Sequence, residues 1–288
     1  MKIALLDKLS RRYNPLYFYL TKPNTRKWVS FTEVVQFMFG STCEQYAPKF
    51  SNKVDEDADY IYYKIKNLDD IFCYPKQASY HHFAQVVTEG MNRNHWHYYE
   101  IPETIVTSDD IVVDCGSAEG FFAFKYQNIA KKIYAVEPLP LFVATLEKLF
   151  VHNHKVEILP IALGNHESSL FMQPNSIGSI CKTEITKEEE PFFIKVNSTT
   201  IDAEFAEKNI PITYIKADLE GFEENMILGA LKTIKINKPK IAITTYHKGQ
   251  DFQKLIDIIQ NVVPEYDYKV KGIESIEGKP VMLHLWCN

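Results

Sequence analysis

Residues 111–120 have the sequence Ile-Val-Val-Asp-Cys-Gly-Ser-Ala-Glu-Gly, and an aromatic segment, Phe-Phe-Ala-Phe, follows at 121–124. The apolar run predicts a buried parallel strand, and the aromatic segment predicts a helix. Gly116 allows the backbone to turn sharply after the strand, and Gly120 allows the helix to begin close to a ligand. We therefore expect a strand, a tight turn and a helix that together hold a ligand.

The chemistry of this turn depends on Asp114. A dinucleotide-binding turn has the spacing Gly-x-Gly-x-x-Gly and offers backbone amides to a pyrophosphate, which a strand-end carboxylate would repel. The spacing here is Asp-x-Gly-x-x-x-Gly, which favours a ligand with cationic groups. S-adenosylmethionine has a sulfonium and an ammonium, and its carboxylate suits the free amides of the turn. A tight turn in some other α/β domain is the alternative interpretation.

The composition is that of an ordinary soluble globular chain, with 288 residues of which 45% are hydrophobic and 24% charged. The net charge of -5 gives no electrostatic footprint for nucleic acid, although a local basic patch can hide in such an average. The five cysteines are scattered without a Cys-x-x-Cys pair, so we expect reduced thiols rather than a zinc or redox site. The sequence shows no signal-peptide pattern and no apolar run of about 18 residues. These features predict a cytoplasmic enzyme without a membrane span.

Residues 1–105 are rich in aromatic side chains and lack the alternation of strands and helices that follows. We expect them to form an N-terminal α+β accessory subdomain. Its expected elements are helices at about 2–20, 31–40 and 80–93, a polar acidic loop at 51–59, and a hairpin of strands at 61–65 and 71–74. The aromatic segment 95–100 is expected to pack this subdomain, with closure over an adenine or sugar ring as the alternative.

Residues 106–288 predict an α/β domain with a mostly parallel, Rossmann-like sheet. The further expected strands span 132–138, 156–164, 212–218 and 240–247, and a terminal antiparallel hairpin uses 266–270 and 281–286. A β-ribbon insertion is expected near 168–200, with a helix beginning near its end, at 199–202. Ser176 and Ser179 fall in its polar loop and are weak candidates for lining the substrate. In such a sheet, an acid about 20 residues after the glycine turn meets the ribose hydroxyls, which is the position of Glu137.

A set of motifs in this order resembles the FkbM-type methyltransferases, which are class I enzymes that use S-adenosylmethionine and in many cases act on hydroxyl groups of sugars or glycosylated natural products. The motifs are Asp-Cys-Gly-Ser-Ala-Glu-Gly at 114–120, Glu-Pro at 137–138, Thr-Thr-Ile-Asp at 199–202, Lys-Ala-Asp-Leu-Glu-Gly-Phe-Glu at 216–223, Leu-Gly-Ala at 228–230 and Thr-Tyr-His at 245–247. The resemblance covers roughly residues 100–288. The glycine turn alone is common to the whole superfamily, whereas the ordered combination is much more specific.

The resemblance implies roles for individual residues. Asp114, Gly116 and Gly120 would hold the methionine end of the cofactor, Glu137 the ribose, and Ala162 the adenine. Asp218 would lie near the methionine ammonium or the transferring methyl group. Ser117, Glu119 and Pro138 complete the expected cofactor-binding set. Many relatives have a neutral turn where this chain has Ser117-Ala118-Glu119, and Glu119 is favourable at a helix N-terminus.

An alcohol becomes a good nucleophile when a base removes its proton. His247 is the first candidate for this base, with Asp218 and Glu220 as alternatives, and a structural hydrogen-bonding role for His247 is weighed equally. A Mg²⁺ site formed by Asp218, Glu220 and His247 is the alternative, but we expect no metal. The pairs His95/His97 and His152/His154 are expected to be loop or surface residues rather than zinc ligands.

Other functions are less well supported by the sequence. Methylation of nucleic-acid bases usually needs an Asn/Asp-Pro-Pro-aromatic tetrad after the fourth strand, where Asp-Leu-Glu-Gly stands at 218–221. A nicotinamide enzyme needs the pyrophosphate turn that is absent here. The expected acceptor is therefore a glycan or other small molecule with a hydroxyl group. We expect no nucleic acid as a partner, and the sequence is compatible with a homo-oligomer. A nonsugar acceptor and a noncatalytic nucleoside-binding module are the alternatives.

Overall fold

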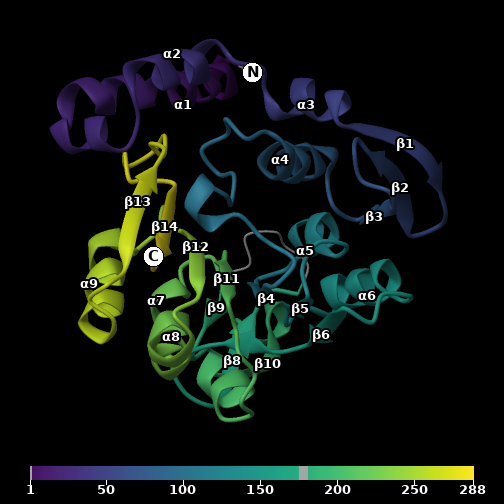
Figure 1. Cartoon of the computed structure of the whole chain (residues 1–288). Helices are drawn as coiled ribbons and strands as arrows, with labels where there is room; N and C mark the ends of the chain where they lie inside the picture. The colour runs from purple at the N-terminus through teal and green to yellow at the C-terminus, as the bar shows by residue number, and fades with distance from the viewer. Residues whose placement is uncertain (1, 175–180) are drawn as a thin grey trace.

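A computed structural model describes residues 2–174 and 181–288, and its centre is a seven-stranded sheet (Figure 1). The strand order is β13-β14-β12-β11-β4-β5-β6. The strands span Ile111–Cys115 (β4), Lys132–Val136 (β5), Val156–Leu159 (β6), Tyr214–Ala217 (β11), Lys240–Thr244 (β12), Asp267–Lys271 (β13) and Met282–Trp286 (β14). β14 is antiparallel to both β12 and β13, and the other neighbouring pairs are parallel. The predicted mostly parallel sheet with a terminal antiparallel hairpin is confirmed.

The strand order reverses at β4, which lies between β5 and β11. In open α/β sheets, ligands bind outside the carboxyl ends of the strands at such a switch point. The register places Asp114 beside Lys216 on β11 and beside Ala135 on β5. The glycine turn after β4 therefore lies at the position where this fold binds its ligand.

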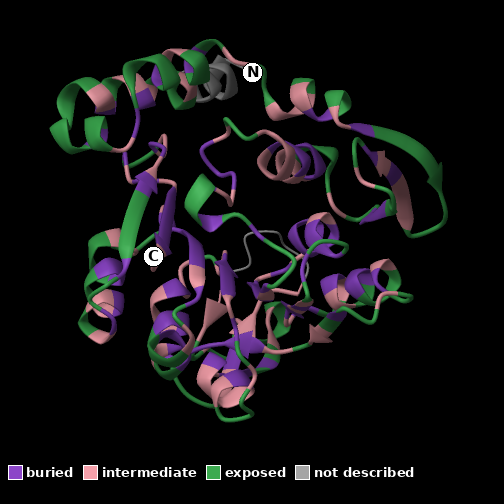
Figure 2. Ribbon diagram, viewed as in Figure 1, coloured by how far each residue is buried: buried purple, intermediate pink, exposed green. Residues whose placement is uncertain are grey.

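Helices cover both faces of the sheet. The helices of this part of the chain are Phe121–Tyr126 (α5), Pro140–Leu149 (α6), Glu223–Leu228 (α7), Leu231–Asn237 (α8) and Phe252–Val262 (α9). Successive residues of a strand point to opposite faces, so Val112 packs in one apolar cluster with Phe124 and Leu146, whereas Val113 packs in a second cluster with Ile227 and Ile256. Figure 2 shows the buried residues concentrated on the central strands.

The N-terminal part combines helices with a small antiparallel sheet of order β1-β2-β3. Its elements are Lys2–Thr21 (α1), Pro23–Lys27 (η1), Phe31–Phe39 (α2), Cys43–Tyr46 (α3), Ala47–Lys49 (η2), Ser51–Glu56 (β1), Tyr60–Ile65 (β2), Ile71–Pro75 (β3), Tyr80–Met91 (α4) and Pro102–Thr104 (η3). The three predicted helices and the hairpin are confirmed. The apolar cluster that contains Phe72 and Phe83 also contains Phe121 and Leu146. One core thus crosses residue 105, and the boundary between two domains there stays a prediction.

The predicted polar loop at 51–59 is wrong in its first part, because residues 51–56 form the edge strand β1. All of its residues after Ser51 are exposed. A strand without a buried face has no alternation of apolar and polar residues, which is the signal on which sequence-based recognition of strands depends.

A second small sheet of order β7-β10-β8-β9 lies beside the carboxyl end of β6. It contains Ala162–Leu163 (β7), Ser168–Met172 (β8), Cys181–Lys182 (β9) and Ile194–Thr199 (β10), with the short turn Glu190–Phe192 (η4) before β10. The predicted ribbon is confirmed, since β8 and β10 pair antiparallel. The predicted single strand at 156–164 is wrong: it breaks at Pro160, which lacks an amide hydrogen, and β7 pairs with β10 instead. The helix expected near 199–202 is a single π-helical turn, Asp202–Ala206 (η5). Ser176 and Ser179 lie outside the described residues.

Two further expectations concern the chain as a whole. All five cysteines are free thiols, as predicted. Among the described residues, no helix combines the length and apolar character needed to cross a membrane.

Candidate functional site

The turn after β4 is held by its neighbours on both sides. The amides of Gly116 and Ser117 both donate to the carbonyl of Val136, at 3.0 Å each. Gly116 has φ +74°, and a Cβ atom there would lie 2.1 Å from the carbonyl oxygen of Asp218. Gly120 has φ +82° and begins α5, where a Cβ atom would lie 2.5 Å from Leu146. Both glycines are thus required by left-handed backbone and close packing.

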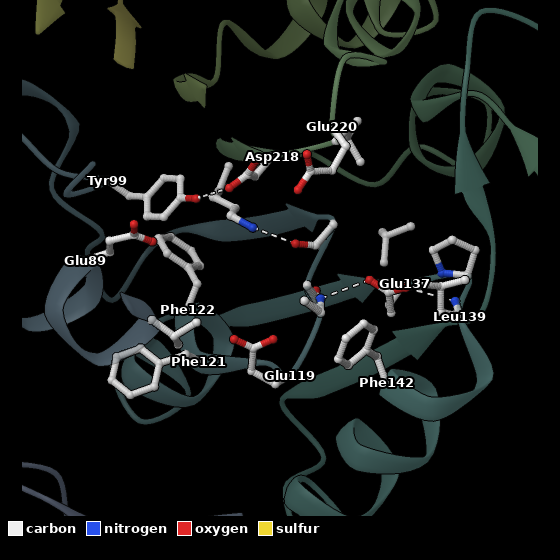
Figure 3. A pocket seen from close by; sticks show the side chains of 18 of the residues that line it. Glu89, Tyr99, Glu119, Phe121, Phe122, Glu137, Leu139, Phe142, Asp218 and Glu220 are labelled. Carbon is white, nitrogen blue, oxygen red and sulfur yellow. Dashed lines mark hydrogen bonds between the residues drawn. The ribbon is translucent and has the colours of Figure 1, made fainter. Parts of the chain in front are cut away.

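A cavity of about 400 Å³ lies over this turn and the ends of β5 and β11 (Figure 3). It is lined by eight of the predicted site residues, which are Gly116, Ser117, Glu119, Glu137, Pro138, Ala162, Asp218 and Glu220. Three predicted residues, Asp114, Gly120 and His247, lie behind this lining rather than in it. The fold therefore brings the strand-end carboxylates together around one space.

Asp114 is fully buried and lies against a lysine that sequence reasoning did not single out. The Nζ atom of Lys216 is 3.0 Å from Oδ1 of Asp114 and donates to the Gly116 carbonyl at 2.7 Å. Burial alone would lower the pKa of Lys216, but the carboxylates of Asp114 and Asp218 raise it. Lys216 therefore stays protonated and neutralises Asp114 beneath the cavity.

Glu137 and Glu119 are buried carboxylates at the other end of the cavity. The two oxygens of Glu137 accept the amides of Ala118 at 3.0 Å and Leu139 at 2.9 Å. Burial raises the pKa of both Glu119 and Glu137 to about 7, an effect that backbone hydrogen bonds partly offset. Each Glu137 oxygen keeps a lone pair for a hydroxyl group.

Asp218 stands at the end of β11 and faces the cavity. Its Oδ2 accepts the Tyr99 hydroxyl at 2.7 Å, and its Oδ1 accepts the Thr244 hydroxyl at 3.2 Å. Burial would raise the pKa of Asp218, but nearby His97, His247 and Lys216 outweigh burial and lower it. Asp218 is accordingly an ionised, firmly oriented carboxylate.

His247 is surrounded by acids. Its Nδ1 lies 2.9 Å from Glu223 Oε1, and its Nε2 lies 3.3 Å from Glu220 and 3.6 Å from Asp218. Burial would lower the pKa of His247, but these three carboxylates raise it to about 9. His247 therefore carries a proton at neutral pH. This charge fits a role in stabilising the neighbouring carboxylates better than it fits a role as general base.

Glu220 lines the cavity beside Asp218, at a left-handed backbone position of φ 53°. Desolvation in the cavity and the neighbouring carboxylates raise its pKa to about 7, although His247 opposes this shift and 41% of the side chain stays exposed. A proton acceptor works best when its pKa is close to the operating pH. Of the three predicted candidates for the base, Glu220 combines access to the cavity with this pKa.

Asp218, Glu223 and His247 place ligand atoms within 4.8 Å of one another and form the one such group of potential metal ligands in the described part of the chain. Glu223 is fully buried and already accepts hydrogen bonds from four groups, which are the amides of Leu219 and Gly221 and the side chains of His247 and Gln250. A carboxylate offers about four lone-pair positions. Glu223 therefore anchors the 219–221 loop and has no lone pair left for a metal.

For the aromatic segment 95–100 the sequence favoured packing of the N-terminal part, with closure over a ligand as the alternative. Glu89 on α4 and Tyr99 line the cavity (Figure 3), and His97 lines it as well. His97 lies in a turn, within the expected loop, but it is buried, and its Nε2 lies 3.7 Å from Asp218. Trp96 packs as expected, stacked on Phe37 at 4.5 Å. The sequence feature that could have indicated this wall of the cavity is the number of hydroxyl and imidazole groups in the aromatic segment 95–100, directly before the glycine strand.

The sheet order, the glycine turn at the switch point and the acid at the end of β5 define the Rossmann-like fold of class I methyltransferases. Residues 114–270 match the sequence profile described as Methyltransferase FkbM domain. The chain belongs to this family of methyltransferases, as the motifs indicated.

Solved structures with a similar chain path have low identity to this protein. A methyltransferase FkbM from Methylobacillus flagellatus KT is 18% identical with a TM-score of 0.49, over 70% of this chain and 54% of that one. An rRNA methylase from Streptococcus thermophilus is 14% identical (TM-score 0.40, 64% and 89% covered), and Aeropyrum pernix fibrillarin with bound S-adenosyl-L-methionine is 9% identical (0.39, 82% and 97%). This chain thus spans about half the length of the first of these proteins. No curated protein sequence matches the chain.

Proposed function

We propose that this protein transfers a methyl group from S-adenosylmethionine to a hydroxyl group of a sugar or glycosylated small molecule. The observation that carries the proposal is the carboxylate-lined cavity at the switch point, where Asp218 and Glu220 face the space above the glycine turn. The family membership supports methyl transfer in general. The choice of oxygen as the acceptor atom rests on the carboxylates.

The lining residues fit a cofactor with cationic groups. Buried Glu119 and Glu137 resist ionisation because they have no cation close by other than Lys216. A bound sulfonium and ammonium would relieve this cost. Glu137 has one unused lone pair on each oxygen for the two ribose hydroxyls, and Ala162 with Phe142 offers an apolar wall for an adenine ring.

When bound, S-adenosylmethionine supplies the electrophilic methyl group and a neutral thioether leaving group. The protein must then orient the hydroxyl and remove its proton. In our proposal Asp218 orients the hydroxyl, and Glu220 accepts the proton. His247 is a positioning residue whose positive charge lowers the pKa of both carboxylates.

A sugar fits the opposite wall of the cavity. Phe121, Phe122, Tyr99 and Tyr246 offer apolar ring surface, and Tyr99 lies directly beside the carboxylate of Asp218. Pockets for small molecules commonly combine an aromatic lining with a few fixed polar groups of this kind. A nonsugar alcohol would use the same groups, and the acceptor assay below distinguishes the two.

Calorimetric titration with S-adenosylhomocysteine tests the cofactor site. We expect micromolar binding by the wild-type protein and an affinity about 10–100-fold weaker for Glu137→Gln, because a hydrogen bond to a charged group contributes about 1.5–3 kcal/mol. Glu157→Gln on β6 is the matched control, since Glu157 is exposed and pairs with Lys132 at 2.9 Å. Absence of binding by the folded wild-type protein would contradict the proposal. Mass spectrometry of sugar and nonsugar alcohols incubated with S-adenosylmethionine then identifies the acceptor class.

A further inference from the structure

A second and larger cavity, of about 1640 Å³, opens between the N-terminal helices and the sheet edge. Its walls come from α1, η1, α2, α3, α4 and β13, and Figure 1 shows α1 and α2 lying beyond the end of β13. Gln85 and Tyr98 line both this basic groove, as we call it, and the first cavity. The two spaces are therefore neighbours that share a wall.

The groove is rich in positive charge, although the whole chain has a net charge of -5. The described lining residues include seven cations, which are Arg11, Arg12, Arg26, Lys27, Arg93, Lys269 and Lys271, and three acids, which are Glu33, Glu44 and Glu100. Each acid is already engaged: Glu33 caps α2 through the Ser30 amide, Glu44 binds His81, and Glu100 accepts from Tyr98 and the Val106 amide. Glu33 and Glu100 still act on Lys271 through their charge, but seven cations against three acids leave the groove with an excess of positive charge.

Some of these cationic side chains form hydrogen bonds within the protein, and others form none with the described residues. Arg12 and Arg26 donate to backbone carbonyls at the ends of α2 and α1. In contrast, the exposed side chains of Lys27, Arg93 and Lys269 make no hydrogen bond or ion pair with the described residues. These three side chains are free to contact a ligand.

The cations around Tyr98 repel one another. Lys271 donates to the Tyr98 carbonyl at 2.7 Å, and burial together with the charge of Lys269 lowers its pKa to about 7. On the other side of Tyr98, Lys125 donates to its hydroxyl at 2.9 Å and lies 3.6 Å from Glu100. Burial lowers the pKa of Lys125 to about 8; Glu100 opposes this shift, and Arg93 adds to it. An anion in the groove would remove this repulsion.

We propose that the acceptor is a phosphorylated sugar, whose phosphate or diphosphate binds in the basic groove against Lys27, Arg93, Lys269 and Lys271. Its sugar would pass Tyr98 and Gln85 and present a hydroxyl group to Asp218 and Glu220. This inference rests on the proposed function, because it assumes that the first cavity is the methyl-transfer site. Arginine and lysine side chains bind phosphoryl oxygens through charge-assisted hydrogen bonds.

The charge distribution favours a small phosphorylated acceptor over a nucleic acid. The groove is positive, but the neighbouring first cavity is lined by Glu89, Glu119, Asp218 and Glu220. The carboxylates of the first cavity would repel the phosphodiester backbone of a nucleic acid, whereas they would not repel an uncharged sugar. The change of sign between the two cavities thus matches a molecule with an anionic end and a neutral end.

Calorimetric titration of the full chain with inorganic pyrophosphate at low salt tests this inference. We expect the wild-type protein to bind pyrophosphate and the double variant Arg93→Gln/Lys269→Gln to bind it at least about tenfold more weakly. The matched control is Lys131→Gln/Lys155→Gln, which removes two exposed charges near β5 and β6 and should leave the affinity unchanged. Uridine 5′-diphosphate and geranyl diphosphate, titrated in parallel, distinguish a nucleotide-linked from a lipid-linked diphosphate.

Three results would overturn the inference: no binding of pyrophosphate, equal binding by the wild type and the groove variant, or an equal loss in the control variant. Tighter binding of a 20-nucleotide single-stranded RNA than of every diphosphate probe, lost in the groove variant, would overturn it in favour of nucleic acid. S-adenosylhomocysteine is titrated separately into each variant. Its binding should not change, so that failure of the groove is distinguished from failure of the methyltransferase site.

Discussion

Replacement of Glu220 by glutamine is expected to lower kcat by about 10²–10⁴-fold, which is the usual contribution of a positioned base. Glutamine keeps the size of the side chain but cannot accept the hydroxyl proton. The measurement is the rate of S-adenosylhomocysteine formation at saturating cofactor and acceptor. Glu224→Gln on α7 is the control, since Glu224 pairs with Lys254 at the surface and does not line the cavity. A Glu220→Gln enzyme with kcat within a few fold of the wild type would exclude Glu220 as the base.

The pH dependence of kcat is a second test of Glu220 as the base. Because Glu220 has a pKa of about 7 and acts as a base when deprotonated, wild-type kcat should rise with pH up to about 7. Above that pH it should stay level, because Asp218 and Glu220 are both ionised there. We expect Glu220→Gln to abolish the rise and His247→Gln to move it to higher pH, because the charge of His247 lowers the pKa of Glu220. A rise that persists in Glu220→Gln would assign it to another group.

Replacement of Lys216 by methionine is expected to destabilise the protein by about 3–5 kcal/mol, because it leaves the fully buried Asp114 carboxylate without its cation. The free energy of unfolding from urea titration measures the effect. Lys240→Met is the control, since Lys240 pairs with Asp110 at 2.6 Å but keeps 23% of its side chain exposed. The control should cost less, because Asp110 keeps the hydrogen bonds donated by the Thr107 amide and by the hydroxyls of Thr107 and Thr213.

The double variant Asp114→Asn/Lys216→Met distinguishes a charge effect from lost packing. Once the carboxylate is neutral, loss of the lysine leaves no uncompensated charge, so the double variant should be more stable than Lys216→Met alone. Strictly additive losses in the two single variants would show that the pair does not interact as inferred.

Much of the methyl-transfer half was predictable from the sequence. Buried parallel strands are continuous apolar runs, and the acids at their ends, such as Glu137 and Asp218, mark the edge of the sheet where a ligand binds. Their convergence on one cavity follows from strand order alone. The exception at Pro160 shows how one missing amide hydrogen moves the following residues into another sheet.

The sequence offered a ligand-covering role for segment 95–100 only as an alternative, because the contacts of this N-terminal wall of the cavity join distant parts of the chain. Tyr99 meets Asp218 across 119 positions, and no local pattern indicates such a pairing. The role of Lys216 could not be predicted for a related reason. A lysine inside an apolar strand has no evident partner in the sequence, and its ion pair with Asp114 depends on the pairing of the two strands. The basic groove gathers Lys27, Arg93 and Lys269 from three separate elements, so its charge is lost in the average over the sequence. The cytoplasmic location and the oligomeric state stay predictions.

The central claim is most directly tested by a crystal structure of the protein with S-adenosylhomocysteine. The account predicts the ligand in the cavity above the glycine turn, with the ribose hydroxyls on Glu137 and the sulfur on the side of Asp218 and Glu220. A ligand bound elsewhere, or a cavity that stays empty at saturating ligand, would contradict the assignment of this cavity to methyl transfer.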